Sequence, residues 1–191
     1  MIKKIPSFFL VVTVLSALLS VGYALASVYT FPQADGDYRQ WQTSSGSRGG
    51  HHVLVDESRC DPNDYVYTTN HGMKDSYHVD LSGIPDYNFI TKIEILACAE
   101  RIDYYDLSTM FLGAFYIFEG IEDGIQEIEL PWHSITTTFY TNIGPYVWDN
   151  LDHIKTPYSD LQVGVVYTEG QNGVKVNNIR SRITYQYGNL E

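Results

Sequence analysis

Beyond its first 26 residues the sequence contains no apolar run long enough to cross a membrane, and basic residues are scarce throughout. A membrane-spanning helix needs about 20 consecutive apolar residues. The densest later run, residues 110–118, has the length of a strand. Only 12 Lys and Arg oppose 23 Asp and Glu, which leaves a net charge of −11. Nucleic acids and anionic lipid surfaces select clustered Lys and Arg, so we expect neither nucleic acid nor a stable membrane anchor among the partners.

Catalytic and metal-binding motifs are also missing. The chain shows no Ser-His-Asp arrangement, no nucleophile elbow and no glycine-rich phosphate loop. His51 and His52 are adjacent, but no further His or Cys follows at the spacing of a zinc site. We therefore interpret the six histidines as hydrogen-bonded or exposed side chains. Catalysis is not supported by any motif.

The first 26 residues have the pattern of an export signal. Lys3 and Lys4 form a basic start, residues 8–21 are almost wholly apolar, and Ala24-Leu25-Ala26 places small residues where a signal peptidase reads. We expect residues 1–26 to be the signal and residues 27–191 to be one domain that is secreted, either extracellular or periplasmic. The exported part then carries 10 basic and 23 acidic residues, a net charge of −13.

Two cysteines, Cys60 and Cys98, lie in the part predicted to be exported. An even pair in an oxidising compartment favours a disulfide. Ile93, Ile95 and Ala97 alternate onto one face of a predicted strand, so Cys98 lies on the other face, where the polar segment around Cys60 can reach it. Two independent buried thiols are the alternative.

Short runs rich in Tyr, Val, Ile, Thr and Phe, separated by Gly, Pro, Asn and Asp, predict an all-β protein. We expect an antiparallel β-sandwich, specifically a jelly roll, with one short helix at 146–154. Residues 33–50 are expected to form loops. The predicted strands are 28–31, 52–56, 64–69, 76–81, 90–100, 110–118, 125–130, 135–141, 161–168 and 174–187.

The last two predicted strands carry finer signals. Gln171-Asn172-Gly173 is typical of a hairpin turn that would pair them. In the final strand the apolar residues lie at even positions through Val176 and at odd positions from Ile179. This change of phase predicts a β-bulge near Asn177 and Asn178.

Carboxylates gather in the predicted loops. Calcium is bound by six to eight oxygen ligands, which loop carboxylates and carbonyls can supply. Asp and Asn are also ordinary turn residues, so both interpretations stay open. The candidate ligands of a calcium ion are Asp35, Asp37, Asp61 and Asp64.

Tyrosine is abundant, with 16 residues, and many lie in or beside polar loops. Tyr offers an apolar face and a hydroxyl group, which suits both sugar stacking and protein contact. It is also a common strand residue, which is the competing explanation. The aromatic residues that we expect to be exposed and to bind ligand are Trp41, Tyr65, Tyr104 and Tyr105.

Glu127 and Glu129 flank Ile128 and lie on one face of a predicted strand. Paired carboxylates of this kind occur in retaining glycosidases. An outward polar face on an edge strand explains them as well, and we favour that interpretation.

Several short segments in this order resemble secreted jelly-roll modules of the lectin and carbohydrate-binding type, some of which belong to microbial surface and phage structural proteins. The segments are Asp35-Gly36-Asp37, Trp41, Val55-Asp56-Glu57, Pro145–Trp148 and Ile183–Tyr187. The resemblance implies a jelly-roll fold and a binding function. It identifies no site, because one fold serves many functions.

Three functions follow as hypotheses. The first is a secreted, non-catalytic module that binds carbohydrate or a cell-surface protein, with calcium as a possible cofactor. The second is a structural subunit that self-assembles, because the segment from Ser27 to Phe31 reads as a strand that could add to the sheet of a neighbour. The third is a glycan-cleaving enzyme that uses Glu127 and Glu129.

Overall fold

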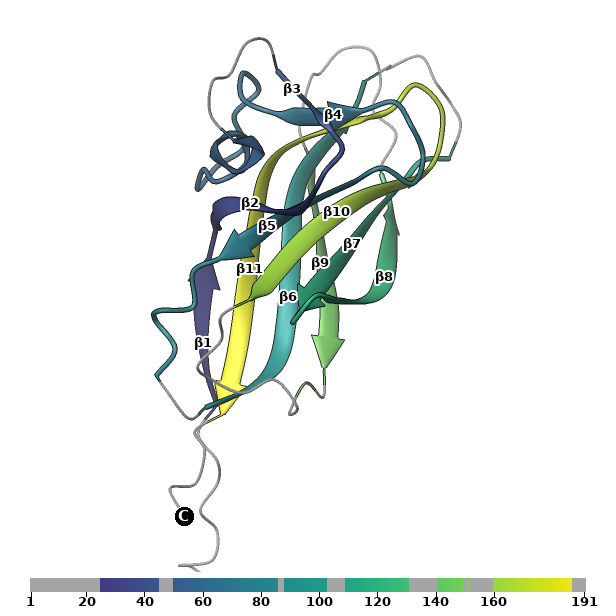
Figure 1. The fold of residues 1–191 in the computed structure, drawn as a ribbon. Coiled ribbons are helices and arrows are strands. Elements are labelled where there is room, and N and C mark those ends of the chain that lie inside the picture. Colours follow the sequence, from purple (N-terminus) through teal and green to yellow (C-terminus); the bar gives the residue numbers. More distant parts are fainter. Residues whose placement is uncertain are drawn as a thin grey trace, which may run out of the picture.

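The chain folds into two antiparallel sheets packed face to face, as the computed structural model shows (Figure 1). This confirms the prediction of an antiparallel β-sandwich. The structure describes residues 25–44, 50–85, 88–102, 109–130, 141–149, 151 and 160–186. Within these ranges, no helix is long and apolar enough to cross a membrane.

Sheet A has the strand order β3-β4-β11-β6-β9, and β1 pairs with β11 beyond the end of β4. In Figure 1, β1 runs beside β11 at one end of the molecule, while β3 and β4 lie at the other. The strands of sheet A are β1 (Leu25–Thr30), β3 (Gln42–Thr43), β4 (Val66–Thr68), β6 (Phe89–Arg101), β9 (Thr141–Asp149) and β11 (Val174–Gln186).

Sheet B has the strand order β2-β5-β10-β7-β8. Its edges are β2, which pairs irregularly with β5, and β8, which forms a hairpin with β7. The strands of sheet B are β2 (Pro32–Arg39), β5 (Lys74–Val79), β7 (Phe111–Phe118), β8 (Ile121–Glu129) and β10 (Leu161–Glu169).

The eight strands from β4 to β11 have the connectivity of a jelly roll. Successive strands alternate between the two sheets, except for the β7–β8 hairpin. The resulting orders, β4-β11-β6-β9 and β5-β10-β7-β8, are those of two nested Greek keys. The jelly-roll prediction is therefore confirmed.

The main core lies between the sheets and follows the period-two alternation of the strands. In β10, Leu161, Val163, Val165 and Tyr167 are at most 2% exposed and belong to this core, as predicted. The central strand β7 is apolar on both faces. Leu112 faces the main core, while Phe115 and Ile117 form a second cluster with Val166.

The predicted bulge is present in β11, where the register with β6 shifts between Val176 and Asn178. The extra residue brings Val176 and Ile179 into the same core although their positions differ in parity. The side-chain amides of Asn177 and Asn178 then donate to the backbone oxygens of Asp61 and Glu57.

The turn at 171–173 was predicted correctly, but the hairpin was not. Asn172 and Gly173 have φ values of 63° and 92°, as a tight turn requires. The turn links β10 in sheet B to β11 in sheet A, so it is an arch between the layers. Both edges of β10 are already paired, with β5 and β7, which leaves no edge for β11.

Three other expectations about secondary structure are wrong. Residues 146–149 of the expected helix belong to β9, and most of the remaining positions up to 154 lie outside the described residues. The strand expected at 52–56 is absent, because its first three residues belong to a short 3-10 helix, η1 (His51–Leu54). Residues 33–50, expected to be loop, contain β2 and β3. The predicted strand at 135–141 lies outside the described residues except for its last position.

The segment after η1 crosses the outer face of sheet A. It starts beside β11, where the amide of Ile179 donates to the oxygen of Val55 over 2.8 Å. It ends over β6, where Cys60 and Cys98 form the predicted disulfide, with a Cα–Cα distance of 5.9 Å. Cys98 is fully buried by this cover. We call residues 55–62 the crossing loop; it divides the outer face of sheet A into two parts.

Candidate functional site

A hollow of about 430 Å³ lies on the β4 side of the crossing loop and is the candidate site. It spans the end of β3, the whole of β4 and the start of β11. We call it the tyrosine cleft. Its lining residues are Thr43, Ser44, Tyr65, Tyr67, Thr69, Ile102 and Lys175.

Two tyrosine rings form the apolar wall of the cleft. Tyr65 and Tyr67 are separated by one residue, so strand alternation places them on the same face while Val66 points into the core. Their ring centroids are 6.0 Å apart, with the planes at 61°. Both rings are partly exposed, so a ligand can reach an aromatic face.

The backbone at Tyr65 is held in place by Ser44. The amide of Ser44 donates to the oxygen of Tyr65 over 2.9 Å, and the amide of Tyr65 donates to the hydroxyl of Ser44 over 3.2 Å. The first bond extends the β3–β4 ladder by one step, and the second holds the amide of Tyr65 through a side chain. The ring of Tyr65 is therefore presented from a fixed strand end, which lowers the entropy that binding would cost.

Lys175 supplies the charge of the cleft. Its Nζ lies 5.1 Å from the centroid of the Tyr65 ring and 2.9 Å from a carboxylate oxygen of Glu100. The Glu100 side chain is only 5% exposed, so Lys175 neutralises a carboxylate that is nearly buried. The ammonium group is thereby held over the aromatic face.

The cleft contains one of the four predicted ligand-binding aromatics, Tyr65. The expected exposure of Trp41 is wrong, because its side chain is 3% exposed and belongs to the core. Its indole Nε1 donates to the oxygen of Met73 over 2.8 Å, which satisfies its only polar atom. Tyr104 and Tyr105 lie outside the described residues.

Sequence reasoning missed Tyr67 and Lys175. The alternation Tyr65-Val66-Tyr67 was a usable signal, because it places two rings on one strand face. No local signal identifies Lys175, which reaches the cleft only through the pairing of β11 with β4.

The four aspartates predicted to bind calcium do not form one cluster with three or more ligands. Among the described residues, no three His, Cys, Asp or Glu side chains are arranged to hold a metal ion. Asp61 accepts hydrogen bonds from the amide and side chain of Asn63, as in an Asx turn. Asp37 is exposed and Asp64 is partly buried.

Asp35 is engaged by protein groups. Its carboxylate accepts from the amide and Nδ1 of His52, over 2.8 and 2.9 Å, and lies 2.9 Å from Nε of Arg39. Burial opposes ionisation of this carboxyl group. The hydrogen bonds from His52 and the charge of Arg39 outweigh it and hold the pKa of Asp35 below its usual value.

The histidines within the described ranges have partners, as predicted. His51 Nδ1 lies 2.6 Å from Asp75, a fully buried carboxylate that also accepts from the hydroxyl of Tyr77 over 2.8 Å. Burial and the negative charge of Asp75 raise the pKa of Tyr77 well above its usual value, so Tyr77 remains a neutral donor. His133 and His153 lie outside the described residues.

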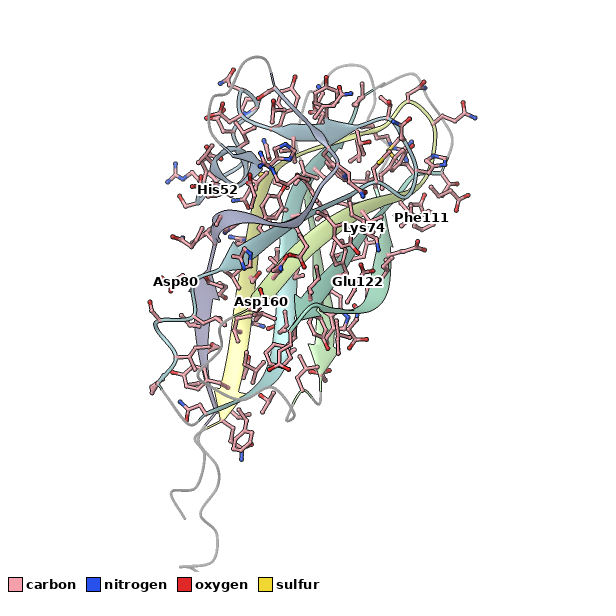
Figure 2. All side chains as sticks on the ribbon, in the orientation of Figure 1. His52, Lys74, Asp80, Phe111, Glu122 and Asp160 are labelled. Atoms are coloured by element: carbon pink, nitrogen blue, oxygen red, sulfur yellow. A yellow bond between two sulfur atoms is a disulfide. The ribbon has the colours of Figure 1, made fainter. Side chains whose placement is uncertain are left out.

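On the outer face of sheet B, charged and aromatic side chains contact one another. Lys74 Nζ lies 2.6 Å from Glu122 and 5.1 Å from the ring centroid of Tyr38; Figure 2 labels this Lys74–Glu122 pair. Glu127 and Glu129 lie on one exposed face of β8, an edge strand, which agrees with the favoured structural interpretation.

The tyrosine cleft therefore combines a partly exposed aromatic wall, a fixed ammonium group and hydroxyl groups in a hollow of ligand size. No protein-family model matches the chain, and no curated protein matches it either.

Proposed function

We propose that the protein is an exported binding module that holds carbohydrate in the tyrosine cleft. The observation that carries this proposal is the Tyr65–Tyr67 wall, backed by Lys175 and flanked by the hydroxyl groups of Thr43 and Thr69. Aromatic faces bind the C–H side of a sugar ring, and hydroxyl and ammonium groups bind its rim. A volume of about 430 Å³ falls in the range of small-ligand sites.

Export is supported by the predicted signal and by the disulfide, which persists in oxidising compartments. Strand β1 begins at Leu25, two residues before the predicted mature start. Cleavage after Ala26 leaves Ser27–Thr30 paired with β11, so four of the six pairs of β1 remain.

The test is retention of the purified protein on insoluble cellulose, chitin and xylan, with calcium and again with chelator. Tyr65→Ala is expected to weaken binding at least about tenfold, as truncation of a central aromatic anchor does. Tyr65→Phe keeps the ring and is the matched control, expected to retain most of the affinity. Thermal melting confirms that each variant is folded.

Each outcome decides a part of the proposal. Unchanged binding by Tyr65→Ala would contradict the cleft as the site, and loss of binding in chelator alone would establish calcium as a cofactor. Retention on none of the three glycans would favour the structural subunit. In that alternative β1 uses the edge that has no partner strand among the described residues, because its other edge is already paired with β11.

A further inference from the structure

A second hollow, of about 220 Å³, lies on the other side of the crossing loop, on the same outer face of sheet A. We call it the arginine hollow. Strand register explains its composition, because Tyr29 pairs with Arg182, Arg182 with Glu94, and Arg180 with Leu96. These five residues line it, and they come from β1, β11 and β6.

The arginine hollow carries a positive charge in an acidic protein. Two guanidinium groups and one carboxylate line it, which leaves a net charge of +1 in a chain of net charge −11. Arg182 donates through Nε and Nη2 to the two oxygens of Glu94, and the bond from Nη2 spans 2.6 Å. Lys92 Nζ lies 3.3 Å from the same carboxylate. Glu94 thus compensates Arg182, and Arg180 remains as the cation in excess.

Arg180 has a donor without a partner. Its Nε is shielded from solvent and makes no hydrogen bond to any described residue. A buried donor of a charged group that stays unsatisfied destabilises the folded protein. Arg180 lies between Ser181, where the pairing of β1 with β11 ends, and Ile179, which bonds to the start of the crossing loop, so among the described residues no strand pairs with it on that edge of β11. An oxyanion in the hollow would pair with the guanidinium group of Arg180 and compensate its charge.

Beside this cation the hollow has an aromatic wall. Tyr29 is 58% exposed, so a ligand can reach its ring, and Leu96 supplies further apolar surface. The volume is below the range of drug-sized ligand sites, so it fits a single ring. A ligand that combines a ring with an oxyanion matches both the aromatic wall and the guanidinium group of Arg180.

We propose that the arginine hollow binds an acidic saccharide, with its carboxylate or sulfate on Arg180 and its ring against Tyr29. This site is separate from the tyrosine cleft, because the crossing loop and its disulfide lie between them. The proposal does not depend on the function of that cleft.

The test measures binding of the purified protein to dextran sulfate, to alginate and to uncharged dextran by affinity electrophoresis. The first two probes distinguish sulfate from carboxylate. We expect the wild-type protein to bind at least one of them and not dextran, with affinity that falls as salt is raised. Arg180→Gln should weaken this binding at least about tenfold.

Arg39→Gln is the matched control, because it removes the same charge from an exposed arginine of sheet B. We expect it to change affinity by no more than about twofold. Arg180→Lys keeps the charge but lacks the planar guanidinium group, and it should also bind several-fold more weakly. If Arg180→Gln is not folded by thermal melting, Tyr29→Ala replaces it, with the same expected loss.

Any of these results would overturn the proposal: equal weakening by the Arg180→Gln and Arg39→Gln changes, wild-type affinity in Arg180→Lys, equal binding to dextran, or complete release by inorganic sulfate at equivalent charge. The last would mean a site for free anions. Tyr65→Ala separates the two sites, since it should leave binding to the acidic glycan intact. Loss in Tyr65→Ala together with wild-type binding in Arg180→Gln would move the anion to the tyrosine cleft.

Discussion

At the scale of single residues, several carboxylates that could bind a metal ion or a ligand are hydrogen-bonded within the protein instead. Asp75 is fully buried and satisfies Tyr77 and His51, and Asp35 satisfies His52 and Arg39. These contacts fasten η1 to strands β2 and β5. A sequence shows which carboxylates lie in loops, but it does not show which of them already have partners.

Asp35 makes stability depend on pH. Its folded pKa lies below its usual value, so it contributes stability above about pH 4 that is lost as pH falls through the lower folded pKa. Asp35→Asn should therefore lower the melting temperature at pH 7 and flatten its decrease between about pH 5 and pH 2. Melting curves across this range measure the effect. Asp37→Asn, at an exposed neighbouring position, is the control, and parallel curves for wild type and Asp35→Asn would contradict the assignment.

At the scale of elements, the structure stabilises the crossing loop through one covalent bond and two side-chain amides. The disulfide joins residues 38 positions apart, and Asn177 and Asn178 bond to the loop from the bulge of β11. The bulge thus changes the phase of the strand and also directs two amides at the loop. Both candidate sites border this loop.

Replacing both cysteines, Cys60→Ser with Cys98→Ser, should lower the free energy of unfolding by about 3–4 kcal/mol, because the bond restricts the unfolded chain. Urea denaturation measures this loss. Reducing the disulfide of the wild-type protein is the control, because it removes the bond without introducing serine hydroxyls. It should lower the free energy of unfolding by a similar amount. A double variant as stable as the wild type would show that the non-covalent contacts of the loop hold it without the disulfide.

Local patterns predicted the elements whose signal lies within one strand. The bulge followed from the change of parity between Val176 and Ile179, and the disulfide from the alternation before Cys98. Errors arose where partners distant in sequence decide the outcome. The turn at Asn172 and Gly173 has hairpin chemistry, but the pairing of β10 on both edges makes it an arch. Trp41 lies in a polar segment, yet the oxygen of Met73 and the core accommodate it.

The candidate sites were only partly predictable for the same reason. Tyr65 was identified as an aromatic beside a loop. Apart from Arg182, the residues that line the sites with Lys175 and Arg180 lie more than 70 positions away in the sequence, and only the register of β11 brings them together. The polar strand β2 was missed because its composition is typical of a loop and its pairing with β5 is irregular.

At the scale of the whole molecule, charge is distributed unevenly. The outer face of sheet A holds Lys92, Lys175, Arg180 and Arg182, one third of the 12 basic residues. The net charge of the chain is nevertheless −11, so the remaining surface is strongly acidic. The acidic crossing loop and the carboxylates of Glu94 and Glu100 lie on the same face, so an anionic ligand is attracted only locally, at the arginine hollow.

Self-repulsion of the acidic surface predicts that salt stabilises the protein at pH 7. The Debye length falls from about 30 Å at 0.01 M to about 8 Å at 0.15 M salt, which screens repulsion between distant carboxylates more than it weakens close, partly buried pairs such as Lys74 and Glu122. The melting temperature should therefore rise over this range of sodium chloride. The rise should vanish near pH 4.8, the isoelectric point, where the net repulsion is absent. A melting temperature that falls with salt at pH 7 would mean that the ion pairs outweigh the repulsion, and a rise that persists at pH 4.8 would mean that salt acts by binding to the folded state.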